Sequence, residues 1–171
     1  MNVKTLLLMR HAKSSWDNAN LRDFDRPLAE RGRRDAPRMA RALVALDSAP
    51  DFIVSSPAVR ARETIEAVIH EGELTAPLEF NEGIYDASTA GLMHIVRRLP
   101  DEHRRVLMVG HNPGFEDLLT RLTGERGRVP TAALACIEFQ VDRWEDIENG
   151  QGKLVWLLTP KQLRKDDGEI E

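Results

Sequence analysis

The stretch Leu6-Leu7-Leu8-Met9-Arg10-His11 decides how the rest of the chain is organised. A short apolar run of this length suits a buried strand of an α/β sheet better than a helix. Arg10 and His11 then emerge at the carboxyl end of that strand, where open α/β sheets place their ligand crevices. An arginine can hold a phosphate with two parallel hydrogen bonds, and a neutral imidazole beside it can act as nucleophile or as acid and base. The alternative is a strand that simply ends in two solvated polar residues.

The composition is that of one folded domain. A chain of 171 residues with 42% hydrophobic residues can bury one substantial core. The formal net charge of -4 argues against a general nucleic-acid-binding protein. The charge is uneven, because residues 1–62 carry 12 Lys and Arg against 7 Asp and Glu. This surplus is compatible with an anionic small substrate and equally with a solvated basic helix.

Cysteine usage and hydropathy bear on the compartment. Cys136 is the single cysteine, so no internal disulfide can form and a reducing cytoplasm is the simplest setting. No stretch approaches the length of a membrane span, and the first apolar run is too short for a signal peptide. We therefore expect a soluble, cytoplasmic protein that does not contact membranes.

Apolar periodicity predicts alternating strands and helices along the chain. Further strands are expected at 51–54, 77–80, 105–110, 132–140 and 153–158. Helices are expected from Glu30, from Pro57 with Ser56 as N-cap, over Leu92 to Leu99, and from Pro113 with Asn112 as N-cap. This alternation predicts the α/β class, as a three-layer α/β/α sandwich with a mostly parallel central sheet of five or six strands. We assign residues 1–160 to one domain and residues 161–171 to a charged C-terminal tail that frays.

Four groups of polar residues follow predicted strands, namely Arg10-His11, Arg60 or Arg62, a carboxylate near Glu82, and His111. Two arginines and two histidines around one pocket form a site for a phosphoryl dianion. One imidazole can attack phosphorus, while a carboxylic acid protonates the leaving oxygen and later activates water. The helix N-terminus expected after His111 adds free N–H groups that favour an anion.

Three segments resemble the signatures of branch 1 of the histidine phosphatase superfamily, also called the phosphoglycerate-mutase-like family. They are Leu6 to His11, Ser55 to Thr64 and Val109 to Gly114, and they occur in the family's order. Within that superfamily, residues 10–16 and Asp25-Arg26-Pro27-Leu28 with Gly32 are most similar to the small SixA-type phosphohistidine phosphatases. The resemblance implies a phosphoglycerate-mutase-like fold and a phosphatase that uses neither metal nor cofactor.

The resemblance also implies roles for the matching residues. It makes His11 the nucleophile that becomes phosphorylated, and it makes Arg10 and Arg60 the arginines that bind phosphate. His111 matches the second histidine, which hydrogen-bonds the transferring phosphoryl group. We place Asn112 beside it among the phosphate-binding residues.

The proton donor is assigned to Glu82, because Asn81-Glu82 followed by Tyr85 resembles the spacing found in mutases. Asp86 is the alternative donor. Arg62 falls on a position that varies in the family, so Arg60 is preferred as the second arginine.

The chain departs from the superfamily next to the nucleophile. Ala12 replaces a common glycine, and Lys13 stands where many sugar-phosphate enzymes have Glu. The chain is also too short for the insertions with which mutases cover extended substrates. These departures favour a shallow, open site, and the phosphohistidine of a protein is the expected substrate.

Three alternatives differ in class. The first is a broad small-molecule phosphomonoesterase or mutase of the same family. The second is a non-catalytic phosphate-binding protein that keeps the fold. A metallohydrolase is disfavoured, because His11 and His111 lack clustered Asp or Cys partners at ligand spacing.

Overall fold

The central element of the fold is β1 (Lys4–Arg10), in a computed structural model that describes residues 2–166. It lies inside a six-stranded sheet of order β3-β2-β4-β1-β5-β6. The other strands are β2 (Phe52–Ser55), β3 (Leu78–Phe80), β4 (Arg105–Gly110), β5 (Leu134–Phe139) and β6 (Lys153–Leu158). The pairs β1–β4, β2–β4 and β2–β3 are parallel, whereas β5 runs antiparallel to both β1 and β6. The predicted α/β fold with a mostly parallel sheet is confirmed.

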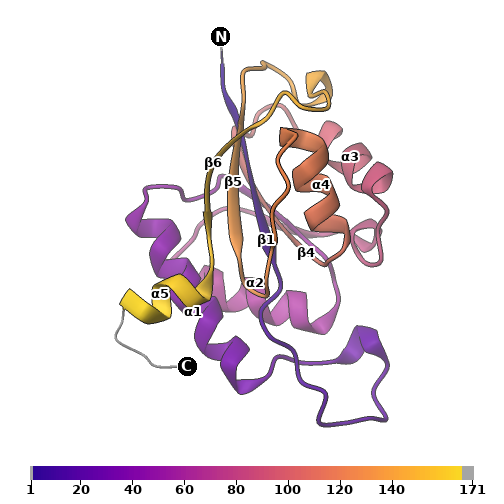
Figure 1. The fold of residues 1–171 in the computed structure, drawn as a ribbon, viewed down its shortest axis with the longest axis vertical. Helices are drawn as coiled ribbons and strands as arrows, with labels where there is room; N and C mark the ends of the chain where they lie inside the picture. Colours follow the sequence, from indigo (N-terminus) through magenta and orange to yellow (C-terminus); the bar gives the residue numbers. More distant parts are fainter. Residues whose placement is uncertain (1, 167–171) are drawn as a thin grey trace.

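Helices cover both faces of this sheet (Figure 1). One face carries α1 (Glu30–Ala45), α2 (Val59–Gly72) and α5 (Pro160–Asp166), and the other carries α3 (Thr89–Arg97) and α4 (Gly114–Thr123). Leu6 and Leu8 of β1 belong to the core under α3 and α4, while Leu7 and Met9 belong to the core under α1 and α2. The apolar run is continuous because both faces of the strand are buried.

Strand register brings distant polar residues to one edge of the sheet. Arg10 lies opposite Gly110, and the His11 N–H donates to the Gly110 carbonyl at 3.0 Å. On the other side of β4, the Ser56 N–H donates to the Val109 carbonyl at 2.9 Å. The residues that follow β1, β2 and β4 are therefore neighbours, although they are far apart in sequence.

The end of β4 has no room for a side chain. A Cβ at Gly110 would lie 2.5 Å from the ring of Phe115 and 2.8 Å from Ile84. The glycine lets α4 pack directly against the strand that carries the second histidine.

Two helix starts differ from the sequence prediction. α2 begins at Val59 with Ala58 as N-cap, so Ser56 does not cap it in the predicted way. α4 begins at Gly114 with Pro113 as N-cap, so Asn112 does not cap it either. Both polar side chains make tertiary contacts at the site instead, and such contacts override local capping preferences.

The first residues of the expected tail belong to helix α5. The prediction that the chain frays from residue 161 is therefore wrong for residues 161–166. The reason is Asp35 of α1, whose carboxylate is 1% exposed and needs cationic partners. Arg164 of α5 donates to both of its oxygens at 3.0 and 2.9 Å. The domain boundary at residue 160 stays a prediction, and residues 167–171 lie outside the described part of the chain. Within residues 2–166, no helix is long and apolar enough to cross a bilayer.

Candidate active site

The two predicted site histidines meet at the carboxyl edge of the sheet. The ring centroids of His11 and His111 are 5.1 Å apart, and the ring planes are tilted by 51°. Their proximity follows from the pairing of Arg10 with Gly110, because each histidine is the next residue along its own strand.

His11 is buried as a neutral imidazole whose Nε2 lone pair faces Arg60. Its Nδ1 lies 2.7 Å from the Ala12 carbonyl oxygen, which can only accept, so Nδ1 carries the proton. Burial lowers the pKa of His11 to about 3, and the positive charges of Arg60 and Arg10 also lower it. Nε2 therefore keeps its lone pair at neutral pH. A nucleophile for phosphorus needs this state.

His111 is also held neutral. Burial lowers its pKa to about 4, with a further contribution from the charge of Arg60. Its Nε2 lies 2.7 Å from the Ser56 hydroxyl, whereas its Nδ1 is buried and has no hydrogen-bond partner among residues 2–166. The second histidine thus has one unused polar atom inside the cluster.

The two predicted phosphate-binding arginines line the same cluster. Arg60, in the first turn of α2, directs its Nε toward His11 Nε2 at 3.4 Å. Arg10 donates from Nη1 to the Val129 carbonyl at 3.3 Å, and its Nε is buried without a partner. Burial lowers the pKa of Arg10, although a guanidinium keeps its charge in proteins. Two cations therefore lie in the cluster with the predicted nucleophile, and Arg10 keeps a buried donor without a partner among residues 2–166.

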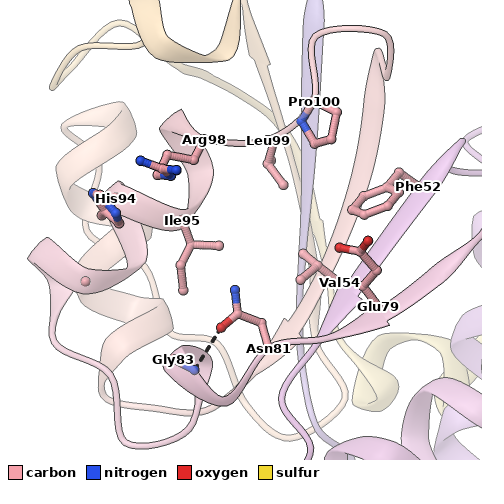
Figure 2. Close-up of a pocket in the computed structure, with 11 residues that line it drawn as sticks. Phe52, Val54, Glu79, Asn81, Gly83, His94, Ile95, Arg98, Leu99 and Pro100 are labelled. Atoms are coloured by element: carbon pink, nitrogen blue, oxygen red, sulfur yellow. Dashed lines mark hydrogen bonds between the residues drawn. The ribbon is translucent and has the colours of Figure 1, made fainter.

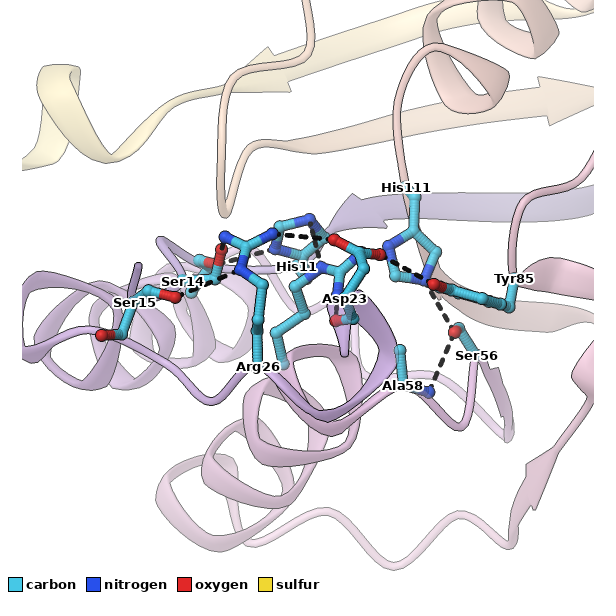
Figure 3. A network of polar contacts seen from close by, with 11 residues as sticks. His11, Ser14, Ser15, Asp23, Arg26, Ser56, Ala58, Tyr85 and His111 are labelled. Atoms are coloured by element: carbon cyan, nitrogen blue, oxygen red, sulfur yellow. Dashed lines mark hydrogen bonds and ion pairs between the residues drawn. The ribbon is translucent and has the colours of Figure 1, made fainter. Parts of the chain in front are cut away.

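A carboxylate that the sequence analysis missed completes the cluster. Asp23, in the short 3-10 helix η1 (Asp23–Asp25), accepts hydrogen bonds from Arg60 at 2.9 Å, Arg26 at 2.9 Å and the Tyr85 hydroxyl at 2.7 Å (Figure 3). Burial alone would raise the pKa of Asp23, but hydrogen bonds from Tyr85, Arg26 and Arg60 outweigh it and lower the pKa to about 2. The carboxylate is therefore ionised at neutral pH.

Arg26 folds the loop that presents Asp23. Its guanidinium donates to the Ser14 hydroxyl and to the Ser15 carbonyl, and it stacks on Trp16 at 3.2 Å from the ring centre. The sequence signal was the segment Asp25 to Leu28, which carried part of the family resemblance and lies beside Asp23. Nothing in the local pattern distinguished Asp23 from any other loop carboxylate.

The residues predicted as proton donors lie outside this network. Glu82 and Asp86 are exposed, and within residues 2–166 neither carboxylate makes a hydrogen bond or an ion pair. The neighbouring Asn81 side chain accepts from the Gly83 N–H at 2.8 Å and so shapes the turn η2 (Glu82–Ile84). The assignment of Glu82 as donor stays a prediction.

Asn112 is near the cluster, but its amide nitrogen already donates to other groups. Nδ2 donates to Glu116 at 3.0 Å and to the Val129 carbonyl at 2.8 Å, while Oδ1 is buried without a partner. Asn112 therefore ties α4 to the segment that also holds Arg10. Its predicted contact with phosphate is not tested by these bonds.

A separate open cavity of about 560 Å³ lies between α3 and the β2–β3 edge of the sheet (Figure 2). Phe52, Asn81, His94 and Arg98 are among its lining residues. The cluster residues His11, His111, Arg10 and Arg60 do not line this cavity. We therefore assign the cavity no part in the chemistry at His11. Among residues 2–166, no group of three or more His, Cys, Asp or Glu side chains is arranged to hold a metal ion.

Two imidazoles and two arginines at the carboxyl edge of the sheet form an arrangement that can bind and act on a phosphoryl group. Residues 6–89 match the histidine phosphatase superfamily (branch 1). An uncharacterised chloroplastic protein of Arabidopsis thaliana is 34% identical over 164 residues, which are 91% of this chain and 75% of that protein. The chain belongs to the histidine phosphatase superfamily.

Solved structures agree with this assignment. The protein histidine phosphatase SixA, solved in complex with tungstate, superposes with a TM-score of 0.81 at 25% identity and covers 93% of this chain and 99% of its own. A mycobacterial glucosyl-3-phosphoglycerate phosphatase, with a TM-score of 0.69 and 18% identity over 90% of this chain and 98% of its own, shares the fold. The predicted SixA-like family and phosphoglycerate-mutase-like fold are confirmed, and the family and site support phosphatase activity.

Proposed function

We propose that this protein removes the phosphoryl group from a phosphohistidine side chain of another protein through a phosphohistidine intermediate on His11. Nε2 of His11 attacks phosphorus and forms an N–P bond, while the N–P bond of the substrate breaks. The substrate imidazole departs with that electron pair, and it leaves neutral if its other nitrogen is already protonated by solvent. Water then attacks phospho-His11, so that phosphate forms, Nε2 regains its lone pair and a proton passes to solvent.

The choice of substrate rests on the protonation and the hydrogen bonds of the carboxylates near the site. Asp23 is bonded to the cluster, but its pKa of about 2 leaves it without a proton at neutral pH. The exposed carboxylates of Glu82 and Asp86 make no hydrogen bond or ion pair with the cluster in the described part of the chain. An alkoxide leaving group needs a general acid, whereas a protonated imidazole does not. Because Glu82, the predicted acid, is not hydrogen-bonded to the cluster, we expect the site to act better on phosphohistidine than on a phosphate ester.

The rim of the site supports a protein as the carrier of the phosphoryl group. Trp16 is 71% exposed, although the guanidinium of Arg26 fixes its ring by stacking. An aromatic side chain held in place beside a site is the type of residue that anchors protein partners. We expect Trp16→Ala to slow dephosphorylation of a phosphoprotein more than that of p-nitrophenyl phosphate.

Glu82→Gln separates the phosphohistidine activity from a phosphomonoesterase activity. We expect the variant to lose most of its activity on phosphoserine and sugar phosphates but little on a phosphohistidine protein. Asp86→Asn is the matched control, because it removes the alternative carboxylate on the same loop. Equal loss of both activities, or a wild type that ignores phosphohistidine, would replace this proposal with a small-molecule phosphatase or mutase.

The covalent step is tested at His11 itself. After a rapid quench with labelled substrate, an acid-labile and base-stable label is expected on His11, and His11→Ala is expected to lose turnover while it stays folded. Activity of His11→Ala at the wild-type level would exclude the covalent route. A folded wild type that binds tungstate without turning over any substrate would indicate a non-catalytic phosphate-binding protein.

We also propose that the reaction needs no metal ion, because Arg10 and Arg60 supply the positive charge near the nucleophile. Full turnover in excess chelator is the expected result, and loss of activity that added metal restores would contradict it. We propose a cytoplasmic location on the basis of the unpaired Cys136. Fractionation of the native cells would test this location.

A further inference from the structure

Ser56 is a buried serine that no part of the proposed reaction uses so far. It follows β2, is 0% exposed, and is held by its N–H bond to the Val109 carbonyl. Its hydroxyl lies 2.7 Å from Nε2 of His111, as the dashed line in Figure 3 shows. This short contact joins a rigid strand end to the second histidine.

The hydrogen bonds of Ser56 determine the direction of that contact. The hydroxyl oxygen accepts the Ala58 N–H at 3.2 Å. Within residues 2–166, the other polar atom bonded to this oxygen is Nε2 of His111. If Nε2 carried the proton and donated it, the Ser56 O–H would be buried without an acceptor, which costs about 1–3 kcal/mol. The satisfied arrangement has the hydroxyl donating to Nε2, so the proton of the neutral ring is on Nδ1.

The tautomer decides what His111 offers to the phosphoryl group. Nδ1 is buried and without a partner, and Figure 3 shows it on the side of the ring that faces Asp23 and His11. With a proton, Nδ1 is a donor for a phosphoryl oxygen bound at His11. Without one, it presents a lone pair that repels the same oxygen.

We propose that Ser56 is a positioning residue that fixes His111 in its Nδ1–H tautomer, so that a neutral imidazole donates a hydrogen bond to the transferring phosphoryl group. The kinetic consequence rests on the proposed function, whereas the tautomer is a property of the resting protein. The two statements can therefore fail independently.

The neighbouring Ser55 provides a matched control. It is also 0% exposed, and its hydroxyl donates to the Ser56 carbonyl at 2.9 Å without touching His111. Ser55→Ala and Ser56→Ala each remove one buried hydroxyl from the same strand end. Loss of stability is thus common to both variants, and a change of tautomer is specific to Ser56→Ala.

The experiment reads the tautomer by long-range ¹H–¹⁵N correlation spectra of the ligand-free protein, with His111 assigned through His111→Gln. We expect protonated Nδ1 in the wild type and in Ser55→Ala, and an Nε2–H population in Ser56→Ala. If the competent tautomer falls to about a tenth, tungstate affinity and kcat/KM are expected to fall about tenfold.

Two outcomes would overturn the proposal. One is a wild-type protein with Nε2 protonated, and the other is a Ser56→Ala spectrum that still shows protonated Nδ1. If Ser56→Ala does not fold, the same spectra are recorded on Ser56→Cys. A thiol is a poor hydrogen-bond donor, so this variant is also expected to show an Nε2–H population of His111. A correct tautomer in a protein without phosphatase activity would reject the proposed function and leave the role of Ser56 in place.

Discussion

Acidification tests whether His11 is buried as a neutral imidazole. Its pKa falls from 6.5 to about 3 on folding, first because burial removes its hydration. Between these two values, the unfolded chain binds a proton at this residue and the folded protein does not. Stability therefore rises with pH across this interval, and it is lost as the pH falls below 6.5.

The size of the loss follows from the two pKa values. One pKa unit corresponds to about 1.4 kcal/mol, so a fall to about 3 gives a full effect of about 5 kcal/mol when the pH reaches that value. Between pH 7.5 and pH 5 the same relation gives a loss of about 2 kcal/mol from this residue. A loss of that size is measurable by urea unfolding.

The comparison is with His11→Asn, which keeps an N–H for the Ala12 carbonyl but does not titrate. We expect the wild type to lose about 2 kcal/mol more than this variant between pH 7.5 and pH 5. His111 titrates in both proteins, so its contribution largely cancels. Equal losses in the two proteins would refute the burial of His11 as a neutral base.

Three further predictions concern the residues around the nucleophile. Arg10→Ala and Arg60→Ala are each expected to lower kcat/KM by at least about 10²-fold, because each removes a preorganised cation. Steady-state kinetics measures the change, and a loss below about threefold would contradict the prediction. Asp23→Ala is expected to weaken tungstate binding about tenfold in calorimetry, because Arg60 loses the hydrogen bond that orients it. Tighter binding would show instead that the carboxylate competes with the anion. Gly32→Ala would place a Cβ 2.2 Å from the Lys13 carbonyl oxygen, so thermal unfolding should show a loss of about 1–3 kcal/mol, and an unchanged Tm would argue against this close packing.

The local pattern of the sequence determined the strands and helices and the positions of the two site histidines. The continuous apolar run from Leu6 to Met9 favoured a strand buried on both faces, and the structure buries it in the two cores on either side of the sheet. The same reasoning located β4, and with it the residue that follows each strand. His11 and His111 could be predicted for this reason, since polar residues after buried strands emerge at one edge of a parallel sheet. The choice of Arg60 over Arg62 came from the family resemblance.

Only the tertiary structure decided how the remaining polar side chains are used. Asp23 lies in a loop without periodicity, and its role depends on Arg60 and Tyr85, which are 37 and 62 positions away. Asn112 and Ser56 carried local capping signals, yet Asn112 bonds to Glu116 and to the Val129 carbonyl, and Ser56 bonds to His111. These contacts outweighed a cap that is worth about 1 kcal/mol. Hydrogen bonds between distant segments leave no trace in local residue spacing, because they form only after the sheet register has brought their partners together.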